Sequence, residues 1–129
     1  MRSTILALAF LGYGLAGAGT AAAQQAKKAA DDAQPVSFTA HVIDLSCNFM
    51  QGASGDGHRS CAQACASKGQ PLALMTDDGQ FYLPINQGMG SDGENARLAE
   101  FAEQSVKVTG KVIKRAGMNA LLIESITGA

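Results

Sequence analysis

The chain has 129 residues, of which 47% are hydrophobic and 16% are charged, and its formal net charge is −1. This length suits one folded domain, and a charge so near zero offers no electrostatic attraction to nucleic acid or to an anionic membrane surface. Tryptophan is absent and aromatic residues make up 5% of the chain, which argues against a platform that stacks bases or sugars.

The N-terminal residues have the pattern of a secretory signal peptide. Arg2 precedes an apolar run over residues 5–18, and three alanines at residues 21–23 form an A-x-A cleavage site. These features predict that residues 1–23 are removed on export and that the protein is periplasmic or secreted. The apolar run is too short for a stable span, so we expect no stable membrane insertion after cleavage.

The folded domain is expected to begin some way after the cleavage site. Residues 24–34 are polar and alanine-rich and have no apolar stripe that could dock on a core, so a flexible N-terminal segment is predicted there. The OB-like domain argued below then spans residues 35–129. A domain of this size has a thin core and often needs a disulfide or a metal to stabilise it.

The domain starts with a predicted strand. Apolar and polar residues alternate from Val36 to Leu45, which is typical of a half-buried strand, and His41 falls on the polar face, where an exposed histidine is expected. Residues 46–57 contain three glycines and predict a loop. A short helix is expected from Arg59 to Lys68, because Gly69 favours a helix end.

Four further strands follow, with a second helix between two of them. Aspartates and a glycine at residues 77–79 predict a hairpin turn, and Gly110 inside a strand predicts a bulge. The expected strands are residues 72–76, 80–85, 105–115 and 120–126, with the helix at residues 95–103. The predicted fold class is mostly β with short helices. It is a small five-stranded OB-like barrel with a helix between strands 3 and 4 and a short cysteine-bearing helix between strands 1 and 2.

The residues with the most distinctive chemistry gather between the first two strands. If residues 58–65 are helical, His58, Cys61 and Cys65 fall at i, i+3 and i+7 and share one face. Cys47 reaches the same place across the glycine-rich loop and completes a Cys₃His ligand set, which typically holds structural zinc. Thiolates also suit Cu(I), so copper is the alternative to zinc. Asp44 is near enough in sequence to orient His58 as a second layer of the site.

The same cysteines also allow an interpretation without metal. In an oxidising compartment Cys47 could pair with Cys61 or Cys65, and the odd number of cysteines leaves one thiol over. The protein would then be a disulfide-stapled binding module whose partner is another periplasmic protein. A third interpretation is a reactive thiol at Cys61, activated by His58. An enzymatic role ranks last, because no acid–base pair, phosphate loop or nucleophile elbow accompanies the cluster.

Several of these features occur together in one known group of proteins. They are Asp44 before Cys47, the H-x-x-C-x-x-x-C motif of His58, Cys61 and Cys65, the Gly69-x-Pro71 motif, and the strand pair at residues 106–112 and 120–123. In these features the chain resembles a family of small exported bacterial OB-fold-like proteins. The resemblance covers the whole mature domain. It implies the fold and the cluster, and it implies no reaction.

Overall fold

The structure is a computed structural model that describes residues 23–25, 27–28, 32–86 and 93–129. The signal peptide expected for residues 1–23 lies, apart from residue 23, outside the described residues, as does part of the expected flexible segment. Within the described ranges, no helix combines the length and the apolar character needed to cross a membrane.

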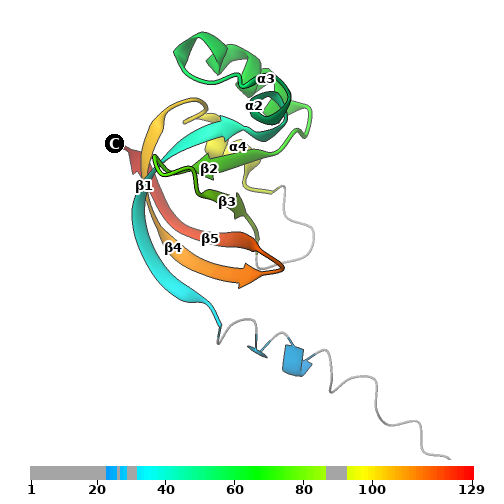
Figure 1. Cartoon of the computed structure of the whole chain (residues 1–129), viewed down its shortest axis with the longest axis vertical. Helices are drawn as coiled ribbons and strands as arrows, with labels where there is room; N and C mark the ends of the chain where they lie inside the picture. The colour runs from blue at the N-terminus through cyan, green and yellow to red at the C-terminus, as the bar shows by residue number, and fades with distance from the viewer. Residues whose placement is uncertain (1–22, 26, 29–31, 87–92) are drawn as a thin grey trace, which may run out of the picture.

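Five strands close into a barrel (Figure 1). In chain order they are β1 (Gln34–Asp44), β2 (Leu72–Met75), β3 (Phe81–Pro84), β4 (Ser105–Arg115) and β5 (Met118–Gly128). The order around the barrel is β1-β2-β3-β5-β4, and β4 pairs back to β1. The pairing of β3 with β5 is parallel and the other four pairings are antiparallel. The prediction of a mostly β fold with a small five-stranded OB-like barrel is confirmed.

Aliphatic side chains that alternate along the strands fill the interior of the barrel. In β4, Val106, Val108 and Val112 are buried and the residues between them are exposed, except for the buried Gly110 on the valine face. Leu74 of β2 and Leu121 of β5 are fully buried in the same cluster. Burial of one such side chain contributes about 1.5–3 kcal/mol, so hydrophobic burial stabilises the barrel.

Gly110 allows β4 and β5 to approach each other closely. The register between these strands shifts between Thr109 and Gly110, which confirms the predicted irregularity. A Cβ atom at residue 110 would collide with the backbone oxygen of Leu122 and would also press on Ile123. A side chain at this position would therefore push the two strands apart.

Three short helical segments connect β1 to β2, outside the barrel wall (Figure 1). They are α2 (Leu45–Gln51), η1 (Asp56–His58) and α3 (Arg59–Ser67). Helix α3 matches the expected cysteine-bearing helix, but the loop expected over residues 46–57 is wrong in its first half, where α2 forms. The Asp44 carboxylate accepts a hydrogen bond from the Cys47 N–H and caps this helix, and Gly52 ends it at φ 66°.

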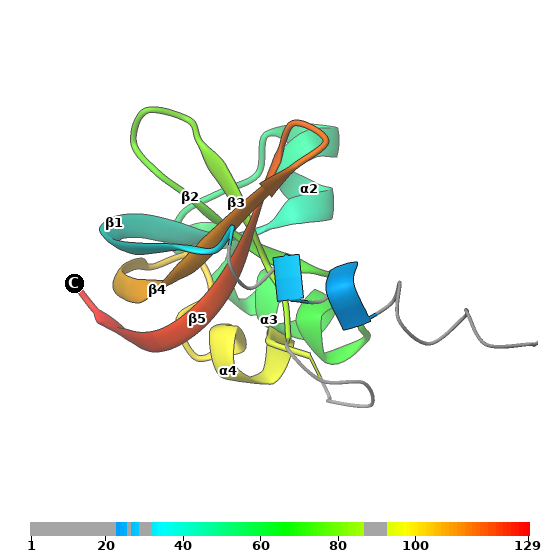
Figure 2. The same cartoon turned by 90° about the horizontal axis from the view of Figure 1, so that it is seen from below.

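Helix α4 (Asn95–Ala99) is shorter than the helix expected over residues 95–103. It packs beside α3 (Figure 2), and the side-chain amide of Gln63 donates a hydrogen bond to the Ala99 carbonyl at 3.0 Å. The chain then turns until β4 begins. In this turn Glu103 has φ 59°, a left-handed conformation that is rare for a residue other than glycine.

Candidate metal centre

The thiols of all three cysteines meet beside the barrel. Cys47 comes from α2, and Cys61 and Cys65 lie four residues apart on α3, which places them on the same face of that helix. Their sulfur atoms lie within 4.8 Å of one another, and each cysteine is free. Sulfur atoms around one tetrahedral ion lie about 3.8 Å apart, given metal–sulfur bonds of about 2.3 Å. The three sulfur atoms would therefore need to move only slightly closer together to bind one ion.

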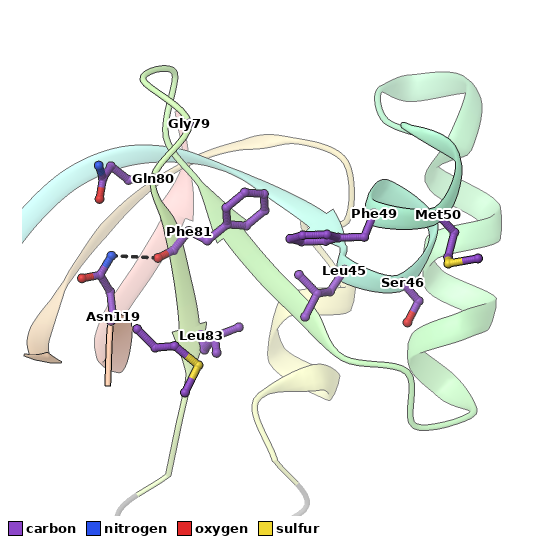
Figure 3. A pocket seen from close by; sticks show the side chains of 11 residues that line it. Leu45, Ser46, Phe49, Met50, Gly79, Gln80, Phe81, Leu83 and Asn119 are labelled. Atoms are coloured by element: carbon purple, nitrogen blue, oxygen red, sulfur yellow. Dashed lines mark hydrogen bonds between the residues drawn. The ribbon is translucent and has the colours of Figure 1, made fainter. Parts of the chain in front are cut away.

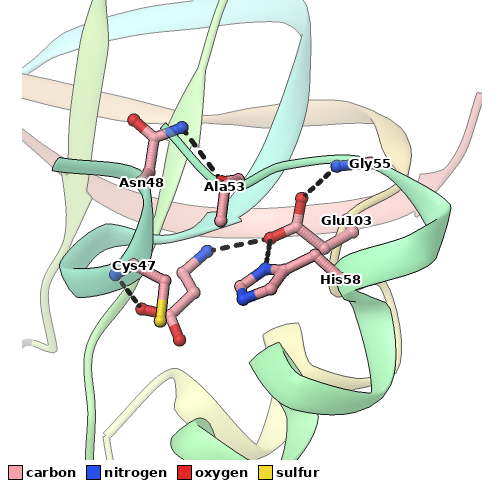
Figure 4. A network of polar contacts seen from close by, with 7 residues as sticks. Cys47, Asn48, Ala53, Gly55, His58 and Glu103 are labelled. Atoms are coloured by element: carbon pink, nitrogen blue, oxygen red, sulfur yellow. Dashed lines mark hydrogen bonds and ion pairs between the residues drawn. The ribbon is translucent and has the colours of Figure 1, made fainter. Parts of the chain in front are cut away.

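His58 brings an imidazole beside Cys47. It lies at the N-terminus of α3, and its ring, the Asp44 carboxylate and the Cys47 sulfur place donor atoms within 4.8 Å of one another. One ring nitrogen, Nδ1, lies 3.1 Å from Oε1 of Glu103. Figure 4 shows the other ring nitrogen pointing toward Cys47. The imidazole thus presents its unused nitrogen to the cluster.

Glu103 is the residue of this centre that the sequence did not reveal. Its side chain is fully buried, and its two carboxylate oxygens accept hydrogen bonds from three groups (Figure 4). Oε1 accepts from His58 Nδ1 at 3.1 Å and from the Asp44 N–H at 3.3 Å, and Oε2 accepts from the Gly55 N–H at 2.8 Å. A carboxylate behind a ligating histidine fixes the ring and makes its free nitrogen a better ligand. This is the role that the sequence predicts for Asp44.

Asp44 has a different environment from the predicted one. Its side chain is fully buried, and Oδ1 accepts the hydrogen bond from the Cys47 N–H at 3.0 Å. Among the described residues, no group meets the geometric limits of a hydrogen bond to Oδ2. Burial raises the pKa of Asp44, but the Cys47 N–H bond and the nearby Cys65 and Cys47 thiols outweigh it and lower this pKa. The centre therefore contains a buried, ionised carboxylate that has the Cys65 and Cys47 thiols beside it, and its Oδ2 accepts no hydrogen bond of ordinary geometry from the described residues.

The pKa values of the Cys65 and Cys47 thiols shift in the opposite direction to that of Asp44. Hydrogen bonding to Asp44, followed by burial and the charge of Asp44, raises the pKa of Cys65 to about 12. Burial and then the charge of Asp44 also raise the pKa of Cys47. Without a cation, these two thiols keep their protons at neutral pH, which is unfavourable for a reactive thiolate. A bound metal ion would supply the positive charge that their ionisation needs.

The centre is open on one side. Cys61 is exposed, whereas Cys47 and Cys65 are partly buried. An ion held by the three sulfurs would therefore face solvent near Cys61 and the protein interior near Asp44. His41, expected on the exposed face of the first strand, is part-buried on β1 with Nδ1 3.4 Å from the Ser105 hydroxyl, and it belongs to neither donor group.

An apolar groove lies next to the centre, on the other side of α2. It has a volume of about 730 Å³, and the rings of Phe49 and Phe81, which both line it, pack against each other with 5.2 Å between ring centroids and a tilt of 42° (Figure 3). Within the described part of the chain, the exposed large hydrophobic side chains are Phe49, Met50 and Met118, and all three line this groove. Helix α2 thus carries a thiol of the centre and a wall of the groove.

Comparison of the chain with protein-family models, with curated proteins and with solved structures gives no match. The residues themselves are then the basis for a functional assignment. The structure brings the three cysteines together and places His58 and Asp44 beside Cys47, but it does not bring His58 within the same 4.8 Å of both Cys61 and Cys65. The residue that the structure adds is Glu103, which hydrogen-bonds to His58. The donor atoms of the five predicted residues form two groups that share Cys47 and are compatible with metal binding.

Proposed function

We propose that this protein is a transition-metal-binding domain whose ligands are Cys47, His58, Cys61 and Cys65. The observation that carries the proposal is the convergence of three thiols from two helices on one point. The imidazole beside them is held by a buried carboxylate, as ligating histidines usually are. Four donors of this kind make a tetrahedral N/S shell, for which zinc is the usual ion.

A disulfide is a weaker explanation of the same geometry. A disulfide between any two of the cysteines would leave the third thiol idle beside it. It would also leave two features unexplained. These are the hydrogen bond between His58 and Glu103, and the buried Oδ2 of Asp44, which accepts no hydrogen bond of ordinary geometry from the described residues. Both features favour a cation at this position.

Zinc is preferred and copper is the alternative. Zinc suits the mixed set of thiolates and imidazole, and it would fasten α2 and α3 to the barrel in a structural role. Cu(I) suits the thiolates alone. The exposure of Cys61 would let either ion be exchanged, which also fits a metal-handling role. We further propose that the protein is exported after cleavage near Ala23.

Elemental analysis tests this function. The protein is expressed with its own leader and purified with its thiols reduced. We expect at least one equivalent of zinc or copper, an N-terminus at Gln24, and no metal in Cys47→Ser. The control is His41→Ala, which changes a histidine outside both donor groups and should keep the metal. Less than about a tenth of an equivalent of any transition metal, with intact thiols, would rule the function out. A Cys47 disulfide in the native protein would favour the stapled module.

A further inference from the structure

The centre has more donors than one tetrahedral ion can use. The outer set consists of the Cys47, Cys61 and Cys65 thiols, and the inner set consists of Asp44, Cys47 and His58. Each set keeps its donor atoms within 4.8 Å of one another, and the two sets share the sulfur of Cys47. If the Cys47 thiolate bridges two ions, these five donors give each ion three protein ligands, which leaves the fourth position of each tetrahedral shell to another ligand such as water.

Asp44 is the strongest sign of a second ion. Its side chain is fully buried, and its cap bond to the Cys47 N–H holds Oδ1 in place. Among the described residues, Oδ2 accepts no hydrogen bond of ordinary geometry. The thiols of Cys65 and Cys47 lie beside this carboxylate, but thiols give up their protons when they bind metal, and a buried charged oxygen is then costly unless it binds a metal itself. His58 and Cys47 place the other two donors of the inner set beside this carboxylate. The inner set therefore offers oxygen, sulfur and nitrogen ligands to one position.

The negative charges of the donor groups also indicate two ions. Three thiolates and the Asp44 carboxylate carry four negative charges, so one divalent ion would leave two of them uncompensated in a partly buried site. Within the described part of the chain, the ion pairs do not include a lysine or arginine on Asp44 or Glu103. Two divalent ions would balance these four charges, and Coulomb attraction in such a site is stronger than in water. The fifth negative group, the Glu103 carboxylate, is stabilised by the three hydrogen bonds that it accepts.

We propose that the centre binds two divalent ions of the zinc class, bridged by the Cys47 thiolate. The inner ion is held by Asp44, Cys47 and His58, and the outer ion by Cys47, Cys61 and Cys65. This inference rests on the proposed function. In the single-ion state His58 completes the shell of the thiol-bound ion, and in the two-ion state it belongs to the inner ion. The outer ion then has its fourth position open to solvent beside the exposed Cys61, where it can exchange.

Metal stoichiometry tests the proposal. The reduced protein is titrated with Zn²⁺, desalted and analysed for zinc and protein. We expect two equivalents in the native protein and one in Asp44→Asn, because asparagine keeps the helix cap but loses the charged oxygen. Cys61→Ser, at an exposed position, should also retain one. The control His41→Ala should retain two, and circular dichroism confirms that each variant is folded.

Saturation of the native protein at one equivalent would overturn the two-ion proposal and leave the proposed function intact. Two equivalents retained by Asp44→Asn would also overturn it, because Asp44 would then not be a ligand. No bound zinc at all, together with no copper, would overturn both proposals. The three results are distinct, so the failure of one proposal is not mistaken for the failure of the other.

Discussion

The barrel and the cysteine cap, which we define as residues 45–67, are stabilised in different ways. The barrel buries aliphatic side chains such as Val42, Leu74 and Leu121 completely. In the cap, α2 and η1 bury none of their residues, and α3 buries only the alanines at residues 62 and 66. Hydrophobic burial therefore explains the barrel and does not explain the cap.

Apart from the Phe49–Phe81 contact and the two buried alanines, polar contacts hold the cap against the barrel. Asp44 caps α2, and the Ser46 hydroxyl donates a hydrogen bond to Gln70 at 2.8 Å. Glu103, from the turn before β4, binds the cap through Gly55 and His58. Helices of seven and nine residues are marginal on their own in water. The comparison teaches that a small domain can combine a barrel held by hydrophobic burial with a neighbouring segment held mainly by polar contacts.

The largest effect on stability is expected in the barrel. Leu74→Ala removes a fully buried side chain and should lower the free energy of unfolding by about 2–5 kcal/mol. Urea unfolding of the protein measures this loss, and the metal bound per folded molecule should not change. The control is Met118→Ala at a 56% exposed position, which we expect to change stability by less than about 0.5 kcal/mol. An equally small loss for Leu74→Ala would mean that the barrel core does not dominate stability.

A change at Glu103 should affect the cap and spare the barrel. In Glu103→Gln the uncharged amide cannot stabilise the His58 ring as a carboxylate does, and its NH₂ group must face one of the donors that Glu103 accepts from. We expect metal affinity to fall about 10–100-fold, measured by competition with a chromophoric chelator. The control is Glu124→Gln on the barrel surface, where Glu124 meets Lys111 at 3.7 Å. An unchanged affinity in Glu103→Gln would show that this carboxylate does not support a ligand.

The smallest expected effect is the pH dependence of the metal-free protein. The pKa of Cys65 is raised in the folded state from its ordinary value of 9.0 to about 12. The unfolded state therefore loses this proton at lower pH than the folded state, so stability falls as pH rises from about 9 toward about 12. Unfolding of the metal-free protein across this range should show the fall, and Cys65→Ser should lessen it. Equal slopes in the two proteins would contradict the raised pKa.

Local sequence patterns predicted most of the barrel. The alternation of residues 105–115 predicted β4 with the same ends that the structure gives, and Gly110 marked the bulge. The spacing of Cys61 and Cys65 predicted a shared helix face on α3, whereas His58, predicted on the same helix, ends the preceding segment η1. These predictions held because each depends on neighbours within a few residues, whose periodicity decides which face is buried.

The missed features involve competing signals or distant partners. Helix α2 had an available signal, since Asp44 can cap a helix and Gly52 can end one, but the glycines after Gln51 favoured a loop. Glu103 had no such signal. It lies 45 residues from His58 and 59 from Asp44, and its positive φ opposes the preference of its own backbone.

The sequence by itself determined the strands, the cysteine-bearing helix and the kind of donors present, because short-range periodicity and side-chain chemistry suffice for these. Only the tertiary structure decided that Glu103 holds His58, that Asp44 is buried with a free oxygen, and that two donor sets share Cys47. The reason is physical: barrel closure and the β1–β2 connection set these distances, and no local pattern records which distant residues a closed barrel brings together.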